Sequence, residues 1–171
     1  MASIKPAATL LAVVLWGASG LCPTMHAMAA TQGAVVTASG QLSDDGLRQM
    51  LDGMGLEPKA LTKGFLIAIK RDTWTYYIQL VLSDNKEKLG MNSNLGIVEN
   101  PDSVTAAQWK ALMVSNGDIE PSFFYFDPAT KKLYLHRVLD NRGLTPAYVR
   151  SQVDAFISNL KGTADLWKFT K

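Results

Sequence analysis

Side chains able to carry acid–base, nucleophilic or metal chemistry are few in this sequence, and they do not cluster. The 171 residues include 2 histidines and 1 cysteine. Histidine is the commonest general base and metal ligand, but His136 stands alone between Leu135 and Arg137, where a strand histidine is usually a hydrogen-bonded or solvated surface residue. Zinc sites need paired cysteines or histidines. We therefore expect no catalytic residue, no metal and no cofactor.

Glycine-rich and acidic motifs do not change this expectation. The chain has no Gly-x-Ser-x-Gly elbow, no phosphate loop and no dinucleotide fingerprint. Asp44-Asp45 could imitate a metal-binding pair, but these carboxylates begin a predicted helix, where they suit the positive end of the helix dipole. A hydrolase that uses two carboxyl groups about 5–9.5 Å apart stays open. Its candidates are the loop residues Glu57, Glu87, Glu99 and Glu120.

Aromatic residues form the more informative class. Thr73 to Ser83 alternates, so that Tyr77 and Val81 point away from Ile78 and Leu80. Tyr134 and His136 likewise oppose Leu133 and Leu135. If helices cover one sheet face, the residues on the other face lie together and can form a partner-binding surface. The alternative is that they are single exposed apolar side chains, which are normal on protein surfaces. The candidate partner-binding residues are Tyr77, Val81, Tyr134 and His136.

A second aromatic run is apolar on both faces of its predicted strand. Such a strand is either buried on both sides or covered by another subunit. The residues of this candidate dimer edge are Phe123, Phe124, Tyr125 and Phe126. Other aromatic residues are expected in the core, on the faces of strands or helices: Trp74, Tyr76, Trp109 and Phe156.

The elements that must position these residues follow from caps and periodicity. Helices are predicted from Ser43 to Gly53, from Pro101 to Asn116-Gly117, with Trp109, Leu112 and Met113 on one face, and from Thr145 to Gly162. Strands are predicted at 65–69, 73–83, 88–97, 122–126 and 132–139, and a tail docks Leu166 and Trp167 on the core. The order α-βββ-α-ββ-α predicts an α+β fold, a five-stranded antiparallel sheet with helices against one face.

The first thirty residues resemble a secretory signal peptide. Lys5 precedes the apolar run Ala7–Trp16, and small residues end at Ala29, where we expect cleavage; Gly20 is an alternative. The run is too short for a membrane span of about 20 residues. Leu21 before Cys22 fits a lipoprotein signal poorly, so we expect no lipid anchor. The chain then divides into a signal peptide (1–29), a flexible lead-in (30–42) and a single domain (43–171).

The charge and cysteine content of the chain limit the classes of partner and fold that we expect. The 17 Lys and Arg residues nearly balance the 15 Asp and Glu residues, whereas a nucleic-acid partner calls for a basic stripe. Cleavage after Ala29 would remove the cysteine, so packing without disulfides must hold the domain. No second apolar run reaches spanning length, so we expect no stable membrane span in the mature chain.

The order of elements resembles the type III secretion chaperone-like fold, which includes the Tir-chaperone type and bacterial sensory transduction regulator domains. The resemblance spans Ser43 to Trp167 and rests on the strands FLIAI and TWTYYIQLVL, the Trp109 helix, the SFFYF and KLYLHRVL hairpin, and the closing helix. It implies a non-enzymatic module, commonly a homodimer, that binds an extended segment of another protein. It supplies no catalytic residues.

The signal peptide sets this chain apart from secretion chaperones of that kind, which act in the cytosol and are acidic. We therefore expect an exported, chaperone-like protein- or peptide-binding module, periplasmic or secreted, that forms a homodimer. Its partner is an unidentified protein. The alternatives are an envelope hydrolase using loop carboxylates and an inhibitor or immunity-type protein that would share the binding surface.

Overall fold

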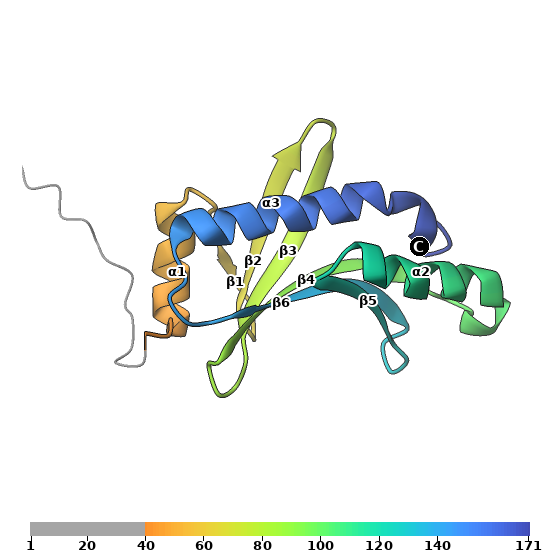
Figure 1. Cartoon of the computed structure of the whole chain (residues 1–171), viewed down its shortest axis with the longest axis horizontal. Helices are drawn as coiled ribbons and strands as arrows, with labels where there is room; N and C mark the ends of the chain where they lie inside the picture. The colour runs from red at the N-terminus through yellow and green to blue at the C-terminus, as the bar shows by residue number, and fades with distance from the viewer. Residues whose placement is uncertain (1–39) are drawn as a thin grey trace, which may run out of the picture. The chain divides into compact units, whose positions relative to one another are not determined.

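The computed structural model describes residues 40–171 (Figure 1). The predicted signal peptide, both cleavage sites, Cys22 and most of the lead-in lie outside this range. The described elements are α1 (Asp44–Gly53), β1 (Lys59–Ala60), β2 (Phe65–Arg71), β3 (Trp74–Leu82), β4 (Lys88–Ile97), η1 (Pro101–Ser103), α2 (Ala106–Asp118), β5 (Ser122–Asp127), β6 (Lys132–Asp140), α3 (Pro146–Gly162) and η2 (Ala164–Trp167).

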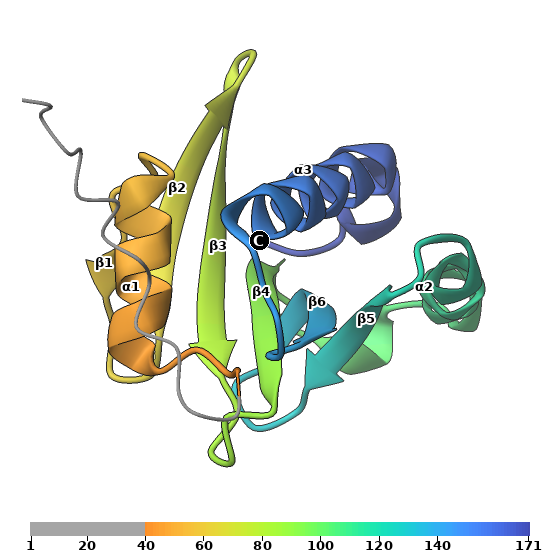
Figure 2. The same cartoon turned by 60° about the vertical axis from the view of Figure 1, so that its left-hand side comes forward.

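The strands form one antiparallel sheet of six strands in the order β1-β2-β3-β4-β6-β5. Five of them fall where the sequence predicts strands, and β4 has the predicted bounds. Burial alternates along the central strands, and the buried side chains of one sheet face join those of α1 and α3 in a single hydrophobic cluster. The α+β class is confirmed: the helices pack on one face of the sheet, and no helix of residues 40–171 covers the other face (Figure 2).

The predicted count of five strands is wrong because no pattern in the sequence identifies β1. It has two residues, Lys59 and Ala60, both exposed, and a two-residue strand shows no periodicity. It pairs with the start of β2 because the chain reverses at Gly64. Gly64 has φ +72°, and a Cβ there would lie 2.1 Å from the carbonyl oxygen of Leu80, so only glycine fits this turn.

Two of the predicted helix starts are confirmed. The Ser43 hydroxyl accepts a hydrogen bond from the Gly46 N–H at 3.0 Å and caps α1. The Thr145 hydroxyl accepts one from the Tyr148 N–H at 3.2 Å, and Pro146 is the first residue of α3. Leu42, at the end of the predicted lead-in, is buried, and its N–H donates to the side chain of Asn141.

The predicted start of the second helix is wrong. Pro101 opens the short 3-10 helix η1, and α2 begins at Ala106. Thr105 and Gln108 form a capping box in which each side chain accepts a hydrogen bond from the other residue's backbone N–H, whereas the Asn100 side chain makes no cap hydrogen bond. The helix also runs past Gly117 to Asp118. Met113 does not share the buried face and is 74% exposed.

The prediction that Trp74 lies in the core is also wrong. It was expected in the core and is 57% exposed, because it lies at the tip of the β2–β3 hairpin, beyond the stretch of β3 that pairs with β4. Tyr76 and Trp109 are partly buried against the core, and so are the tail residues Leu166 and Trp167. The apolar stripe of α3 is buried as predicted: Val149, Val153, Phe156, Ile157 and Leu160.

Two buried polar side chains tie the strands to the rest of the domain. Arg137 is 3% exposed and donates to the Ser122 hydroxyl and the Gln152 side chain, both at 2.8 Å. Burial lowers the pKa of its guanidinium. Asn141 is fully buried and bonds the backbone of Leu42 and Lys86. Removing one partner from such buried pairs is costly because the other is left unsatisfied.

The closing helix gives a direct stability prediction. Phe156 is fully buried, so Phe156→Ala should lower the free energy of unfolding by about 3–5 kcal/mol. The control is Tyr148→Ala, half exposed on the same helix, which should change it by less than about 1 kcal/mol. Urea unfolding measures both. A loss below about 1.5 kcal/mol for Phe156→Ala would contradict the assignment of α3 as a core element.

Candidate functional site

Four aromatic side chains of β5 and β6 meet on the uncovered sheet face, and we name them the aromatic patch: Phe123, Tyr125, Tyr134 and His136. The Tyr125 and Tyr134 rings stack with centroids 5.0 Å apart and planes at 11°. Phe123 meets His136 edge-on at 5.0 Å. Each pair is also a register partner across the two strands. The structure thus joins two predicted partner-binding residues with two residues of the predicted dimer edge.

The patch faces solvent because the alternate residues of the same strands face the core. Leu133, Leu135 and Phe124 are buried, whereas Phe123 and Tyr125 are each 38% exposed. Tyr134 and His136 are half-buried between their neighbours. Aromatic rings fixed in rows by a sheet lose little side-chain freedom on contact with a partner. The patch is therefore a preformed, partly exposed apolar surface.

His136 is held without charge at neutral pH. Burial lowers its pKa from the ordinary value of 6.5, and its Nδ1 lies 2.5 Å from the Asn92 Oδ1 of β4. Burial also raises the pKa of the Tyr125 hydroxyl, as do Tyr134 and Asp127 beside it. The patch is accordingly uncharged at neutral pH, which lowers the cost of removing it from water.

Val81 reaches the patch across a glycine. A Cβ on Gly90 of β4 would lie 3.2 Å from His136 Cε1 and 3.4 Å from Val81 Cγ1, so the absence of a side chain lets both residues approach over β4. Val81 and Val138 are the register partners of Gly90 on its two sides. The predicted residue Val81 therefore borders the aromatic patch.

Tyr77 is not part of the aromatic patch. It lies on β3 and is 59% exposed, whereas Tyr134 lies on β6, with β4 between the two strands. Two strand spacings separate them by about 10 Å. The Asn92 and Asn94 side chains of β4 face His136 and Tyr134 in register and stand between the two predicted tyrosines. The four predicted partner-binding residues thus share a face but not a single cluster.

The outer edge of β5 is closed over its first half. The Phe124 N–H donates to the Asn116 Oδ1 of α2 at 2.7 Å, and the Ser122 N–H donates to the carbonyl oxygen of Ile119 at 2.9 Å. The ring of Phe126 packs against that of Trp109, with centroids 5.5 Å apart and planes tilted by 58°. Because backbone groups alternate along a strand, Phe126 carries the next outward-facing amide. Strand addition at β5 therefore has room only at its far end.

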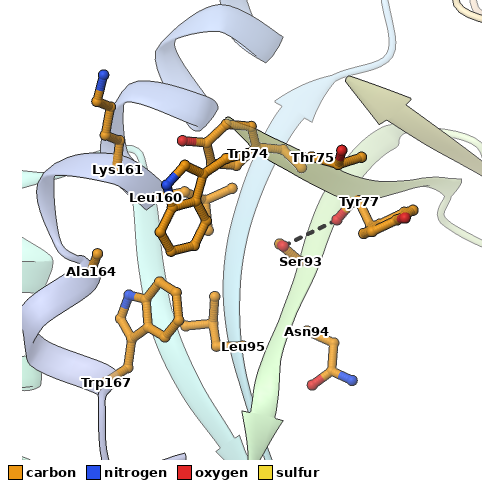
Figure 3. Close-up of a pocket in the computed structure, with 11 residues that line it drawn as sticks. Trp74, Thr75, Tyr77, Ser93, Asn94, Leu95, Leu160, Lys161, Ala164 and Trp167 are labelled. Carbon is orange, nitrogen blue, oxygen red and sulfur yellow. Dashed lines mark hydrogen bonds between the residues drawn. The ribbon is translucent and has the colours of Figure 1, made fainter. Parts of the chain in front are cut away.

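A cleft lies on the other side of the sheet, where β3 and β4 separate. It has a volume of about 240 Å³. Figure 3 shows the Trp74 ring of the hairpin and the Trp167 ring of η2 in this cleft, with Leu160 beside Trp74 and Leu95 beside Trp167. Trp74 also stacks on Tyr76 at 6.5 Å. Trp167 Nε1 is buried and has no hydrogen-bond partner within residues 40–171.

Sequence reasoning missed this cleft. The alternation of β3 correctly places Trp74 and Tyr76 on the side of the sheet that faces the core. The local pattern does not reveal that β4 pairs with β3 only from Gln79 to Leu82 and leaves Trp74 and Tyr76 without a strand on that side. No pattern within the strand could have revealed it, since Trp74 and Tyr76 alternate in the same way as the buried residues Ile78 and Leu80 that follow them.

The carboxylates of the alternative hydrolase lie in separate loops. Glu99 pairs with Lys171 at 2.8 Å, and Glu87 accepts from Asn85 at 2.8 Å. Glu87 shares a polar cleft with Asp140, but the hydrogen bond and charge of Lys88 lower the pKa of Asp140, which suits an ion pair and not a general acid. From residue 40 onward, no group of three or more His, Cys, Asp or Glu is placed to hold a metal. In that same part of the chain, no helix is long and apolar enough to cross a membrane.

Comparison with known proteins gives a fold and no family. No protein-family model matches the chain, and no curated protein sequence matches it. Among solved structures, YbjN from E. coli, a candidate transcription regulator, superposes with a TM-score of 0.53 at 17% identity, covering 70% of this chain and 87% of YbjN. The resemblance expected from element order is thereby confirmed for the fold, which this chain shares with YbjN.

Two further structures overlap less closely. The HopA1–SchA chaperone–effector complex gives a TM-score of 0.48 at 10% identity, over 67% of this chain and 86% of that chain. The ExsC–ExsE complex gives 0.45 at 20% identity, over 70% and 86%.

The environment of His136 predicts a pH effect on stability. A histidine whose pKa is lower in the folded than in the unfolded chain favours folding above the unfolded value of about 6.5, and this contribution is lost as the pH falls through the folded pKa. The free energy of unfolding should therefore fall more between pH 7.5 and 5.5 in the wild type than in His136→Gln. The histidine resonance of the Ala30–Lys171 chain should titrate below 6.5. Titration above 6.5 would contradict the burial of this ring.

Proposed function

We propose that this protein is an exported, non-enzymatic module that binds another protein through the aromatic patch. The observation that carries the proposal is the uncharged cluster of Phe123, Tyr125, Tyr134 and His136 on a sheet face that no described helix covers. Exposed aromatic surface of this kind marks interaction sites on soluble domains.

The chemistry of the patch favours a protein over other classes of partner. Tyrosine is enriched among the residues that dominate protein interfaces, since its ring buries apolar area and its hydroxyl keeps a hydrogen bond. Small-molecule sites are concave, whereas these rings stand on a sheet face. Nucleic acid binds through phosphate contacts to Lys and Arg, and none of the four patch residues is a lysine or an arginine. A protein segment with apolar side chains meets these conditions.

The closed edge of β5 indicates how such a segment would lie. Asn116 occupies the Phe124 N–H, so a strand added along the whole of β5 would have to displace it. A segment that lies across the strands on the uncovered face does not have to displace Asn116. It can reach Asn92 and Asn94 for hydrogen bonds while its apolar side chains contact the rings of the aromatic patch.

Export and a homodimer complete the proposal. Export is supported by the signal-peptide pattern of residues 1–29, and a periplasmic or secreted location follows from it.

The homodimer is supported by the edge position of β5 and by the exposed α2 side chains Met113 and Val114. Light scattering of the mature chain over a range of concentrations tests it, and a monomer at every concentration would remove the homodimer from the account.

A double variant tests the binding surface. The mature Ala30–Lys171 chain is cross-linked in the envelope fraction of its own cells, and captured proteins are identified by mass spectrometry. Tyr125→Ser with Tyr134→Ser should reduce capture of a reproducible partner at least tenfold, because it removes the stacked pair. Its melting temperature should shift by less than about 8 °C, as for a change of about 1 kcal/mol.

The control is Tyr148→Ser, an exposed tyrosine of α3 that lies outside the patch. It should capture the partner as well as the wild type does. Equal capture by the double variant would show that the patch is not the binding surface, and cooperative unfolding at a much lower temperature would show that its tyrosines are core.

A further inference from the structure

The first half of β3 has one strand neighbour where the second half has two. β2 pairs with β3 from Trp74 to Leu80, whereas β4 pairs with it only from Gln79 to Leu82. The Ser93 hydroxyl of β4 donates to the Tyr77 carbonyl oxygen at 3.0 Å, and this bond marks where the strands separate (Figure 3). Beyond it, β3 runs to the hairpin tip without a second neighbour among residues 40–171.

The unpaired side of β3 exposes backbone hydrogen-bonding groups. Because the Tyr77 carbonyl points to β4 and backbone groups alternate along a strand, the N–H and C=O groups of Thr75 point to that side too, as does the N–H of Tyr77. Trp74 and Tyr76 use theirs on β2. A row of unpaired strand groups is a template for another extended chain.

The cleft described above adjoins this unpaired side. Its volume of about 240 Å³ is that of about eight water molecules, at about 30 Å³ each, and its walls are the rings of Trp74, Tyr76 and Trp167 with Leu95 and Leu160. That space suits one large apolar side chain. Trp74, 57% exposed at the hairpin tip, has no role in the core and forms the outer wall.

Charge at the rim adds a further preference. Among residues 40–171, Lys161 is the one charged residue that lines the cleft. Its ammonium group lies 3.2 Å from Asp72, but both side chains are largely exposed, and such pairs contribute little stability. An acidic side chain of a ligand can therefore compete for Lys161 at low cost.

We propose that an extended segment of a partner protein adds to β3 at Thr75 and Tyr77, inserts a large apolar side chain into the cleft and places an acidic side chain beside Lys161. Side chains of a strand alternate between faces, so the neighbour of the inserted residue lies on the uncovered face beside Tyr77. The inference rests on the proposed function, protein binding, and assigns it a second contact that is separate from the aromatic patch. It follows the β-augmentation mode of peptide recognition.

Selection from a phage library of random 12-residue peptides tests this site without a known partner. The bait is the mature Ala30–Lys171 chain. Recovered peptides should carry one large aromatic or aliphatic residue with an acidic residue two positions away, on the same face of the strand. Synthetic copies should protect the Thr75 and Tyr77 amides from hydrogen exchange. Replacing the anchor residue by Ser, or N-methylating the peptide backbone next to it, should weaken binding at least tenfold.

Two variants of the protein alter the cleft in opposite ways. Trp74→Ala removes its exposed wall, and Ala164→Phe fills it from η2; each should weaken peptide binding at least tenfold with cooperative unfolding retained. Trp74→Ala keeps the test valid if Ala164→Phe fails to fold, since Trp74 is exposed. The matched control is Tyr125→Ser with Tyr134→Ser, which leaves the cleft intact and should bind the peptides as the wild type does.

Failure of this inference is distinct from failure of the proposed function. If no peptide is recovered, or if recovered peptides bind the cleft variants as tightly as the wild type, the β3 site is overturned, while loss of partner capture in the patch variant would still support protein binding. If the Thr75 and Tyr77 amides are already protected in the free mature chain, and dilution or removal of residues 30–39 releases them, the occupant is a second copy or the chain's own lead-in, and the partner segment is overturned.

Discussion

The alternation of side chains along the strands is the constraint on which the other features of this domain depend. The strands β2 to β6 send alternate residues into the cluster formed with α1 and α3, and a slip by one residue would turn the whole set to solvent. The same alternation leaves Tyr125, Tyr134 and His136 on the uncovered face once Leu133, Leu135 and Phe124 are buried. The core and the candidate binding surface are thus two consequences of one register.

Local patterns in the sequence were sufficient where one residue or one period decides the structure. Ser43 and Thr145 cap their helices with their own hydroxyls, and the stripe of α3 from Val149 to Leu160 repeats at the helical period and is buried. The start of α2 shows the limit of this reading. Pro101 is a good first residue of a helix, but the capping box of Thr105 and Gln108 satisfies more backbone donors and prevails.

Features that depend on neighbours in space could not be predicted in the same way. Trp74 alternates like a core residue, and its exposure follows from where β4 leaves β3, which no pattern within β3 encodes. Tyr77 and Tyr134 share a face as expected, yet β4 stands between them with Asn92 and Asn94. Conversely, two of the predicted binding residues, Tyr134 and His136, lie in one cluster with two residues of the predicted dimer edge, Phe123 and Tyr125, since β5 and β6 are adjacent. The shared fold with YbjN concerns the arrangement of elements and leaves these local features to this chain.

Hydroxyl-radical footprinting of the mature protein, alone and with its captured partner, tests the central claim most directly, because it reports the solvent access of individual aromatic side chains. The account predicts that oxidation of Phe123, Tyr125, Tyr134 and His136 falls when the partner binds, while oxidation of the exposed Tyr148 on α3 stays unchanged. If the partner protects Tyr148 and leaves the four patch residues as reactive as before, the uncovered sheet face is not the binding surface and the account is wrong.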